Sequence, residues 1–294
     1  MNRRGYALLV VVAVLGVLSV AAGLTALSAR TSTAGARADL DQVRYRAAIE
    51  AGAARAAAGL LREDEADRWS PDGRAYEFEL DGLTVTVRPV AETGRFDLNR
   101  GNPETLAALL EAVGVDRRAA LTVAGAVPDW RDEDDDRGQN GAEAPSYRAE
   151  NLPPPGNRPF VAVEEFRRVL GVDAEIYRLV APYLTIHGGE QVAALYAPPT
   201  LLEALDLPRG DASRILAARR TGAPPPEIAE TGAFDPGSGA RYALFIEVTA
   251  SSGAGLARIV TVQLPGEDAA MDVLGRTPLP LGAAVRLLEP ESDA

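Results

Sequence analysis

The chain contains no cysteine and no lysine, and His187 is its single histidine. The absence of cysteine excludes disulfides, thiolate metal sites and cysteine nucleophiles. The absence of lysine excludes Schiff-base chemistry and the lysine of a phosphate-binding loop, and one histidine cannot form a site of several histidines. A formal net charge of −12 argues against a basic face that binds nucleic-acid phosphates. Stability must come from core packing or from a metal held by oxygen ligands.

What the chain does contain begins with a long uncharged run at 7–29, preceded by Arg3-Arg4-Gly5-Tyr6 and ended by Arg30. Such a run can cross a bilayer core as a helix, with the two arginines on the cytoplasmic side. Three interpretations compete: a cleaved secretory signal with Ser19-Val20-Ala21 at its site, a plain membrane anchor, or a short leader cut between Gly5 and Tyr6. The glycine directly before the apolar run favours the leader, since an anchor needs no helix breaker there.

The segment from Thr31 to Glu63 contains no proline and is rich in alanine. Its apolar residues recur at helical spacing: Leu40, Val43, Ala47, Ala51, Ala54, Ala58 and Leu61. This pattern predicts that the membrane helix continues into the aqueous phase as one amphipathic rod. A cleaved signal would normally be followed by a turn or linker, so the rod also favours the leader.

Two pairs of short alternating runs predict β-hairpins. In the first, Tyr76, Phe78 and Leu80 are separated from Leu83, Val85 and Val87 by an Asp-Gly pair, a strong hairpin signal. In the second, residues 242–249 and 257–264 flank a glycine-rich loop. We expect one antiparallel sheet with the aqueous part of the long helix on one face.

The stretch between the hairpins, about 95–225, is predicted to be helical and to contain an internal repeat. Its three copies begin near Asn102, Val163 and Pro198, and each consists of a short helix, a tight turn and a second helix. The pattern resembles the helix-hairpin-helix that grips DNA backbones. Because the turns lack the Gly-x-Gly form and the chain is acidic, packing of the hairpins into a helical core is favoured.

An acidic run between the first two copies predicts a calcium loop. Asp132, Asp134 and Asp136 fall at positions 1, 3 and 5 of such a loop, with Asn140 at position 9 and Glu143 at position 12. The match departs from an EF-hand, because Arg137 replaces the usual glycine at position 6 and no flanking EF helices are evident. The alternative is a solvated, mobile loop.

No catalytic constellation stands out, so we expect a protein that is not an enzyme. His187 lies at the end of the second repeat, where a surface residue is more common than a catalytic base. Trp69 and Trp130 are predicted to be packing anchors.

The order of these features resembles the type II secretion system protein K family of minor pseudopilins, also called general secretion pathway protein K. The similarity covers nearly the whole chain and is weakest after about residue 265. It rests on the leader and on these segments: Phe96-Asp97-Leu98-Asn99, Asn102-Pro103, Asp129-Trp130-x-Asp132-x-Asp134, Asn140-Gly141-Ala142-Glu143, Pro159-Phe160-x-x-Val163-Glu164-Glu165-Phe166 and Pro182-Tyr183-Leu184-Thr185.

The resemblance implies an α+β pseudopilin fold, with a long N-terminal helix packed on an antiparallel sheet and a large helical insertion. The expected parts are a leader (1–5), the transmembrane part of the helix (6–29), a pseudopilin α/β part (30–94), an inserted helical domain (95–225), and the remaining strands with a C-terminal tail (226–294).

The resemblance also implies processing by prepilin peptidase after Gly5, with N-methylation of Tyr6. It implies calcium held by Asp132, Asp134 and Glu143, with Asp136 and Asp129 as less certain ligands. Ala144-Pro145-Ser146-Tyr147 departs from the family's pattern. The implied partners are other minor pseudopilins at the tip of the pseudopilus, and not nucleic acid. The implied location is the bacterial inner membrane, crossed once, with the C-terminal domain in the periplasm.

Val10 supports a place at the tip. Pilins usually carry a glutamate at mature position five, which pairs with the terminal amine of a neighbouring subunit, and that position here is Val10. A buried charge without a partner is costly, so a subunit without the glutamate needs no neighbour above it. The alternatives are a membrane-anchored DNA receptor of the competence type, which would need a basic face, and an anchored hydrolase that uses His187.

Overall fold

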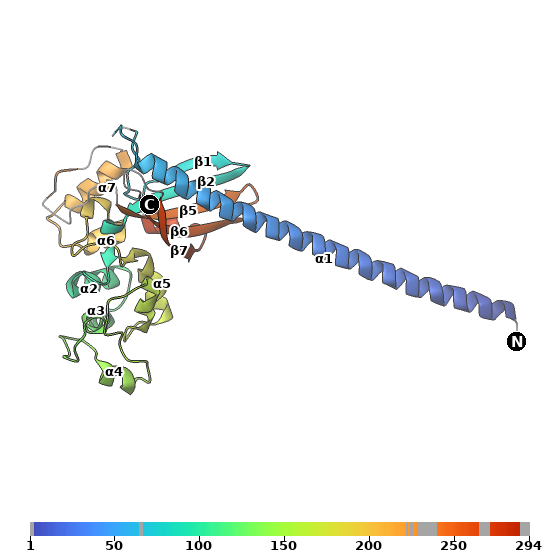
Figure 1. Cartoon of the computed structure of the whole chain (residues 1–294), viewed down its shortest axis with the longest axis horizontal. Coiled ribbons are helices and arrows are strands. Elements are labelled where there is room, and N and C mark those ends of the chain that lie inside the picture. Colours follow the sequence, from blue (N-terminus) through green and yellow to red (C-terminus); the bar gives the residue numbers. More distant parts are fainter. Residues whose placement is uncertain are drawn as a thin grey trace. The chain divides into compact units, whose positions relative to one another are not determined.

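The computed structural model describes residues 3–64, 67–221, 223, 226–228, 240–264 and 271–288. Within the first helix, side chains are described from Gly35 onward and at positions 15, 16, 18 and 19. The chain divides into two units, residues 1–48 and residues 49–294. The second unit contains the sheet and the insertion, and the first contains the N-terminal part of the long helix (Figure 1).

The predicted rod is a single helix, α1 (Arg3–Leu60). In the described part of the chain no helix is both long and apolar enough to span a bilayer. The predicted cleavage site at Gly5 and Tyr6, Val10, and nearly all side chains of the predicted membrane segment 6–29 lie outside the described side chains. These predictions therefore stay predictions.

The buried face of α1 differs from the predicted amphipathic stripe. Leu40, Val43 and Leu61 belong to that stripe and are 63%, 61% and 41% exposed. The buried side chains between 49 and 60 are instead Ile49, Ala53, Ala56, Ala57 and Leu60. Both faces of the helix are rich in alanine, so periodicity alone does not distinguish them.

Both predicted hairpins are confirmed, and they form one antiparallel sheet in the order β1-β2-β5-β6-β7 (Figure 1). The strands are β1 (Tyr76–Leu80), β2 (Leu83–Ala91), β5 (Arg241–Ala250), β6 (Gly255–Gln263) and β7 (Asp272–Leu279). Asp81 and Gly82 both have positive φ in the first turn, as a tight two-residue hairpin requires. The strand β7 is not predicted individually from the sequence, because Gly275 and Pro278 interrupt its pattern.

Small residues let α1 approach the sheet closely. A Cβ added at Gly52 would lie 3.0 Å from Ile246 Cγ2 and 3.3 Å from Val85 Cγ1. At the margin of this contact, Glu50 forms an ion pair with Arg276 on β7 at 3.0 Å. The helix α8 (Ala283–Leu288) packs on a second cluster that includes Val90 and Phe245. The sheet thus contacts α1 through Val85 and Ile246, and it contacts α8 through Val90 and Phe245.

The insertion lies between β2 and β5, and its described part contains three helical hairpins, as the repeat predicts. They are α2 (Pro103–Ala112) with α3 (Arg117–Arg131), η2 (Val163–Arg168) with α5 (Ala174–Val180), and α6 (Pro199–Ala204) with α7 (Asp211–Thr221). The first helix of the second hairpin is a 3-10 helix. Short elements complete the insertion: η1 (Glu92–Gly94), β3 (Phe96–Asp97), α4 (Ala144–Ala149), η3 (Ala181–Tyr183), β4 (Leu184–Thr185) and η4 (Ala194–Tyr196).

Each hairpin turns at a glycine with positive φ: Gly114, Gly171 and Gly210. In the first two, an aspartate two residues later caps the next helix, since Asp116 and Asp173 accept backbone N–H groups of the first turn. The apolar faces of the hairpins share one buried cluster that includes Leu106, Trp130 and Phe166. This is the arrangement that the helical-core interpretation predicts.

Polar contacts join segments that the resemblance picks out. The Asn99 side chain donates to the Phe160 carbonyl at 3.0 Å and accepts from the Phe160 N–H at 2.7 Å. Arg131, at the end of α3, donates to the carbonyl of Leu98 at 2.6 Å. The parallel pair β3–β4 brings Phe96 beside Leu184. The start of the insertion, the end of α3 and the second hairpin are therefore held together.

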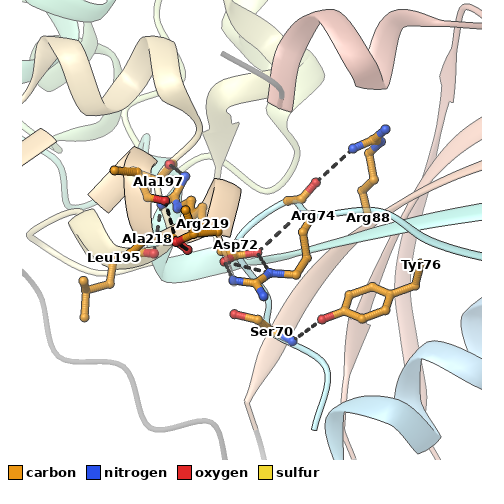
Figure 2. Close-up of polar contacts among 12 residues, drawn as sticks. Ser70, Asp72, Arg74, Tyr76, Arg88, Leu195, Ala197, Ala218 and Arg219 are labelled. Carbon is orange, nitrogen blue, oxygen red and sulfur yellow. Dashed lines mark hydrogen bonds and ion pairs between the residues drawn. The ribbon is translucent and has the colours of Figure 1, made fainter. Parts of the chain in front are cut away.

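Arg219 of α7 ties the last hairpin to the turn η4, as Figure 2 shows. Its guanidinium donates to the carbonyls of Ala197 at 2.7 Å, Leu195 at 2.9 Å and Ala194 at 3.2 Å. Burial lowers the pKa of Arg219 to about 10, and the negative charge of Asp72 opposes this shift. Arg219 is therefore charged at neutral pH. Asp72 itself is ion-paired with Arg74 at 2.7 Å.

The turn η4 that Arg219 holds also packs on the start of the insertion. The Ala193 N–H donates to the Thr93 carbonyl at 2.7 Å. A Cβ at Gly94 would lie 2.5 Å from the carbonyl oxygen of Tyr196, so this approach requires glycine. The first element of the insertion, η1, thus contacts η4, and Arg219 connects η4 to the last hairpin.

Replacing Arg219 with methionine should destabilise the protein. The change removes three charged hydrogen bonds to partly buried carbonyls, which costs about 1–3 kcal/mol. Unfolding in urea, monitored by circular dichroism, measures this loss. Arg220→Met on the same helix is the control, because Arg220 is exposed. Equal stability of the two variants would contradict the role of Arg219.

Candidate metal centre

The predicted calcium loop lies between two helices. The helix α3 ends at Arg131, directly before Asp132, and α4 begins at Ala144, directly after Glu143. The sequence did not indicate α4, because it has only six residues and Pro145 in its first turn, which give little helical periodicity. Asp132 follows α3 as its C-cap, and Glu143 precedes α4 as its N-cap.

Three of the predicted ligands come together. Asp132, Asp134 and Glu143 each offer a carboxylate oxygen, and these oxygens lie within 4.8 Å of one another. Hard oxygen donors at this spacing suit calcium. Asp136, the fourth predicted ligand, is exposed and is not a member of this group. Its backbone N–H donates to Asp134 Oδ1 at 2.8 Å, so it shapes the loop beside the cluster.

Three carboxylate oxygens of this group, both from Glu143 and one from Asp132, are buried without a hydrogen-bond partner among the described residues. Glu143 is 4% exposed, and neither of its carboxylate oxygens has a hydrogen-bond partner among the described residues. Oδ1 of Asp132 is likewise buried without a partner in that part of the chain. Buried polar atoms are normally satisfied, and buried carboxylates require compensation for their charge. A bound cation would satisfy these oxygens.

The pKa values of Asp132 and Glu143 express the same cost. Burial raises the pKa of the Asp132 carboxyl, and the charges of Asp134 and Asp129 raise it further. Burial also raises the pKa of the Glu143 carboxyl, followed by the charges of Asp129 and Asp132. A divalent cation would reverse both effects by neutralising the cluster.

Asp129 and Asn140, the other candidates in this segment, have different surroundings. Asp129 is buried, and its two carboxylate oxygens each accept from the Gly138 N–H at 3.2 Å. Asn140 is exposed and has a φ of 58°, so it serves as a turn residue. Neither belongs to the group of three carboxylates.

The remaining candidates of the sequence are placed as follows. His187 is half-buried, and burial lowers the pKa of its imidazole. Trp130 is buried and stacks on Phe160 at 5.8 Å, and Trp69 stacks on Tyr76 at 4.0 Å. Both tryptophans are packing anchors, as predicted.

Comparison with known proteins places this chain. A family model for "Type II secretion system (T2SS), protein K" matches residues 94–189, the segment that contains the candidate metal centre. The curated type II secretion system protein K of Klebsiella pneumoniae is 31% identical, with 62% of each chain covered. The protein K of Pectobacterium carotovorum subsp. carotovorum is 29% identical, again with 62% of each chain covered. The chain thus spans about 62% of the length of these curated relatives.

A solved structure shares the fold. A chain in the crystal structure of the GspK-GspI-GspJ complex from the enterotoxigenic Escherichia coli type 2 secretion system matches with a TM-score of 0.54 and 18% identity. The match covers 82% of this chain and 98% of that chain. The fold is therefore α+β and is shared with that chain. Residues 94–189 thus match the type II secretion system protein K family, to which both curated relatives also belong.

We expect the metal-free protein to lose stability as the pH rises. The raised pKa values of Asp132 and Glu143 mean that the folded chain binds more protons than the unfolded chain above about pH 4. The contribution is fully present below the unfolded pKa values and is lost as the pH rises through the folded ones. Glu143→Gln stays neutral and should flatten this loss.

Urea unfolding in the presence of a chelator measures the effect. Measurements between pH 4 and 7, about half a pH unit apart, define the slope of the unfolding free energy against pH. Asp136→Asn is the control, since Asp136 is an exposed acid outside the cluster. An identical slope in wild type and Glu143→Gln would contradict the expectation.

Proposed function

We propose that this protein is a minor pseudopilin at the tip of the type II secretion pseudopilus, where it supports initiation of the pseudopilus and protein export across the outer membrane. The observation that carries the proposal is the pairing of two features in one chain. A helix of 58 residues contributes its C-terminal part to a sheet domain, and a large insertion of helical hairpins interrupts that sheet between β2 and β5. The first feature suits a filament subunit, and the second adds bulk that a stacked subunit would have to accommodate.

The partners in this proposal are other minor pseudopilins. The solved complex that shares the fold contains GspK, GspI and GspJ together. On α1, Leu40 and Val43 are 63% and 61% exposed. Large apolar side chains at helical spacing are the anchors by which one helix packs against another. These residues are therefore candidates for contact with a neighbouring α1-like helix.

The proposed location is the bacterial inner membrane, crossed once by residues 6–29, with the rest of the chain in the periplasm. Prepilin peptidase would cut between Gly5 and Tyr6 and leave Tyr6 to be methylated. The role is structural, and we propose no catalytic activity and no nucleic-acid partner. The net charge of −12 supports the absence of a nucleic-acid partner.

The metal in this proposal is calcium, held by Asp132, Asp134 and Glu143. When bound, it supplies positive charge that neutralises the three carboxylates. Asp132 caps the end of α3 and Glu143 caps the start of α4. A calcium ion bound to both carboxylates would therefore join the two helices. The aromatic core behind them, with Trp130 and Tyr147 6.1 Å apart, would be held in place as a result.

Calcium should bind the purified protein and raise its unfolding temperature. Isothermal titration calorimetry of the chelator-treated protein should give a heat signal for one strong site, because the buried carboxylates lack other partners. Asp132→Asn and Glu143→Gln should weaken the affinity at least tenfold, and Asp136→Asn should weaken it less. No heat signal and no shift in the melting temperature would sink this part of the proposal.

Val10→Glu tests the place at the tip. The new carboxylate would lie in the membrane without a partner amine, which is costly, so we expect impaired assembly and secretion. Val10→Leu is the control of similar size and should behave as wild type. Mass analysis of protein made together with a prepilin peptidase should first show an N-terminus at Tyr6. Unchanged secretion by Val10→Glu, or an N-terminus elsewhere, would contradict the proposal.

A further inference from the structure

The carboxylate of Asp129 faces the loop and does not belong to the group formed by Asp132, Asp134 and Glu143. Asp129 is in the last turn of α3 and is 2% exposed. Both of its oxygens accept from the backbone N–H of Gly138 at 3.2 Å. A Cβ at Gly138 would lie 2.8 Å from Asp129 Oδ1, and a Cβ at Gly141 would collide with Asp129 Oδ2. The segment 138–141 is therefore closed around this carboxylate.

Gly125, one turn earlier on α3, provides the surface on which the same segment rests. It is buried, and a Cβ there would lie 2.7 Å from the carbonyl carbon and oxygen of Asn140 and 2.8 Å from the oxygen of Gln139. Real Cβ atoms do not approach backbone atoms so closely, so any larger residue would displace the loop. Glycine inside a helix costs up to about 1 kcal/mol relative to alanine, and here the cost is offset by the close approach of the loop.

Further hydrogen bonds fix the end of the segment. The Gly141 N–H donates to the Gly138 carbonyl at 3.0 Å, and Arg137 Nε donates to the Gly141 carbonyl at 2.7 Å. The next residues, Ala142 and Glu143, are buried. The direction in which Glu143 leaves the loop is thus determined by the turn that Asp129 and Gly125 hold.

We propose that Asp129, with Gly125 as its seat, is a positioning residue that shapes the 138–141 turn before any cation binds, and that it is not itself a ligand. The turn places Glu143 opposite Asp132 and Asp134. Preorganisation of this kind raises affinity because less freedom is lost on binding, and partners behind the ligands commonly tune a metal site. The inference rests on the proposed calcium site, but the shaping of the turn does not require calcium.

Hydrogen exchange of the calcium-free full chain tests the positioning role directly. The chain is kept in detergent with a chelator, and mass spectrometry follows peptides that cover residues 133–141. We expect exchange at Gly138 to be at least tenfold faster in Asp129→Ala than in wild type. Asp129→Asn keeps one acceptor oxygen and should retain part of the protection. Glu143→Gln, which alters a ligand, should leave Gly138 as protected as in wild type.

Calcium titration of the same variants tests the consequence. Gly125→Ala leaves all carboxylates in place, yet it should weaken calcium affinity at least tenfold. Gly275→Ala is the matched control, because a Cβ at Gly275 meets nothing within 4 Å. Circular dichroism confirms that each variant is folded, and Asp129→Asn serves in place of Asp129→Ala if the latter does not fold.

Two results would overturn the inference. One is an unchanged exchange rate at Gly138 in the Asp129 variants, and the other is wild-type affinity in Gly125→Ala. A loss of affinity in Asp129→Asn as large as in Asp132→Asn, with Gly138 still protected, would make Asp129 a ligand instead. If wild type does not bind calcium, the proposed metal site fails, while the exchange rates still decide whether Asp129 shapes the turn.

Discussion

The close packing of the second half of α1 on the sheet is the contact on which the rest of the fold depends. Gly52 lets the helix approach the side chains of Val85 and Ile246, and Ile49, Ala53 and Ala56 complete a buried face. N-terminal to this buried face, α1 also carries exposed apolar residues such as Leu40 and Val43. One helix thus belongs to a domain core and offers a second apolar surface, which is what the proposed assembly into a filament requires.

The insertion is tied at its base to this sheet domain. The chain leaves the sheet after β2, and the last hairpin of the insertion lies in contact with the first element through η4. Arg219 contributes a half-buried charge to this junction, where its guanidinium donates to three carbonyls. Charged hydrogen bonds in a buried setting are strong and directional, so they specify one arrangement of the hairpins where apolar contacts alone would permit several.

Negative charge at the candidate metal centre has the opposite effect, because buried carboxylates oppose folding until their charge is compensated. Glu143 and one oxygen of Asp132 are buried without partners in the described part of the chain, and Asp129 adds a further charge close by. A protein without cysteine cannot join the ends of α3 and α4 by a disulfide. A cation held between Asp132 and Glu143 would perform the same cross-linking task, which gives the acidic run a physical purpose.

Much of the fold is local enough to be read from the sequence. The Asp-Gly turn, the two alternating pairs of runs and the three helical hairpins each depend on neighbouring residues, and all of them appear in the structure. The buried face of α1 was not predictable, because both faces are rich in alanine and only contact with the sheet distinguishes them. The short α4 and the interrupted strand β7 also gave weak periodic signals.

The sequence by itself determined the oxygen ligands and the spacing of Asp132, Asp134 and Glu143. Both are local properties, because they depend only on residue type and on separation along the chain. Only the tertiary structure decided that Glu143 is buried, that Asp136 lies outside the group, and that Asp129 faces Gly138. The reason is that burial and hydrogen bonding depend on what α3 and the aromatic core bring against the loop. The spacing of the acids along the chain does not specify which residues pack against the loop.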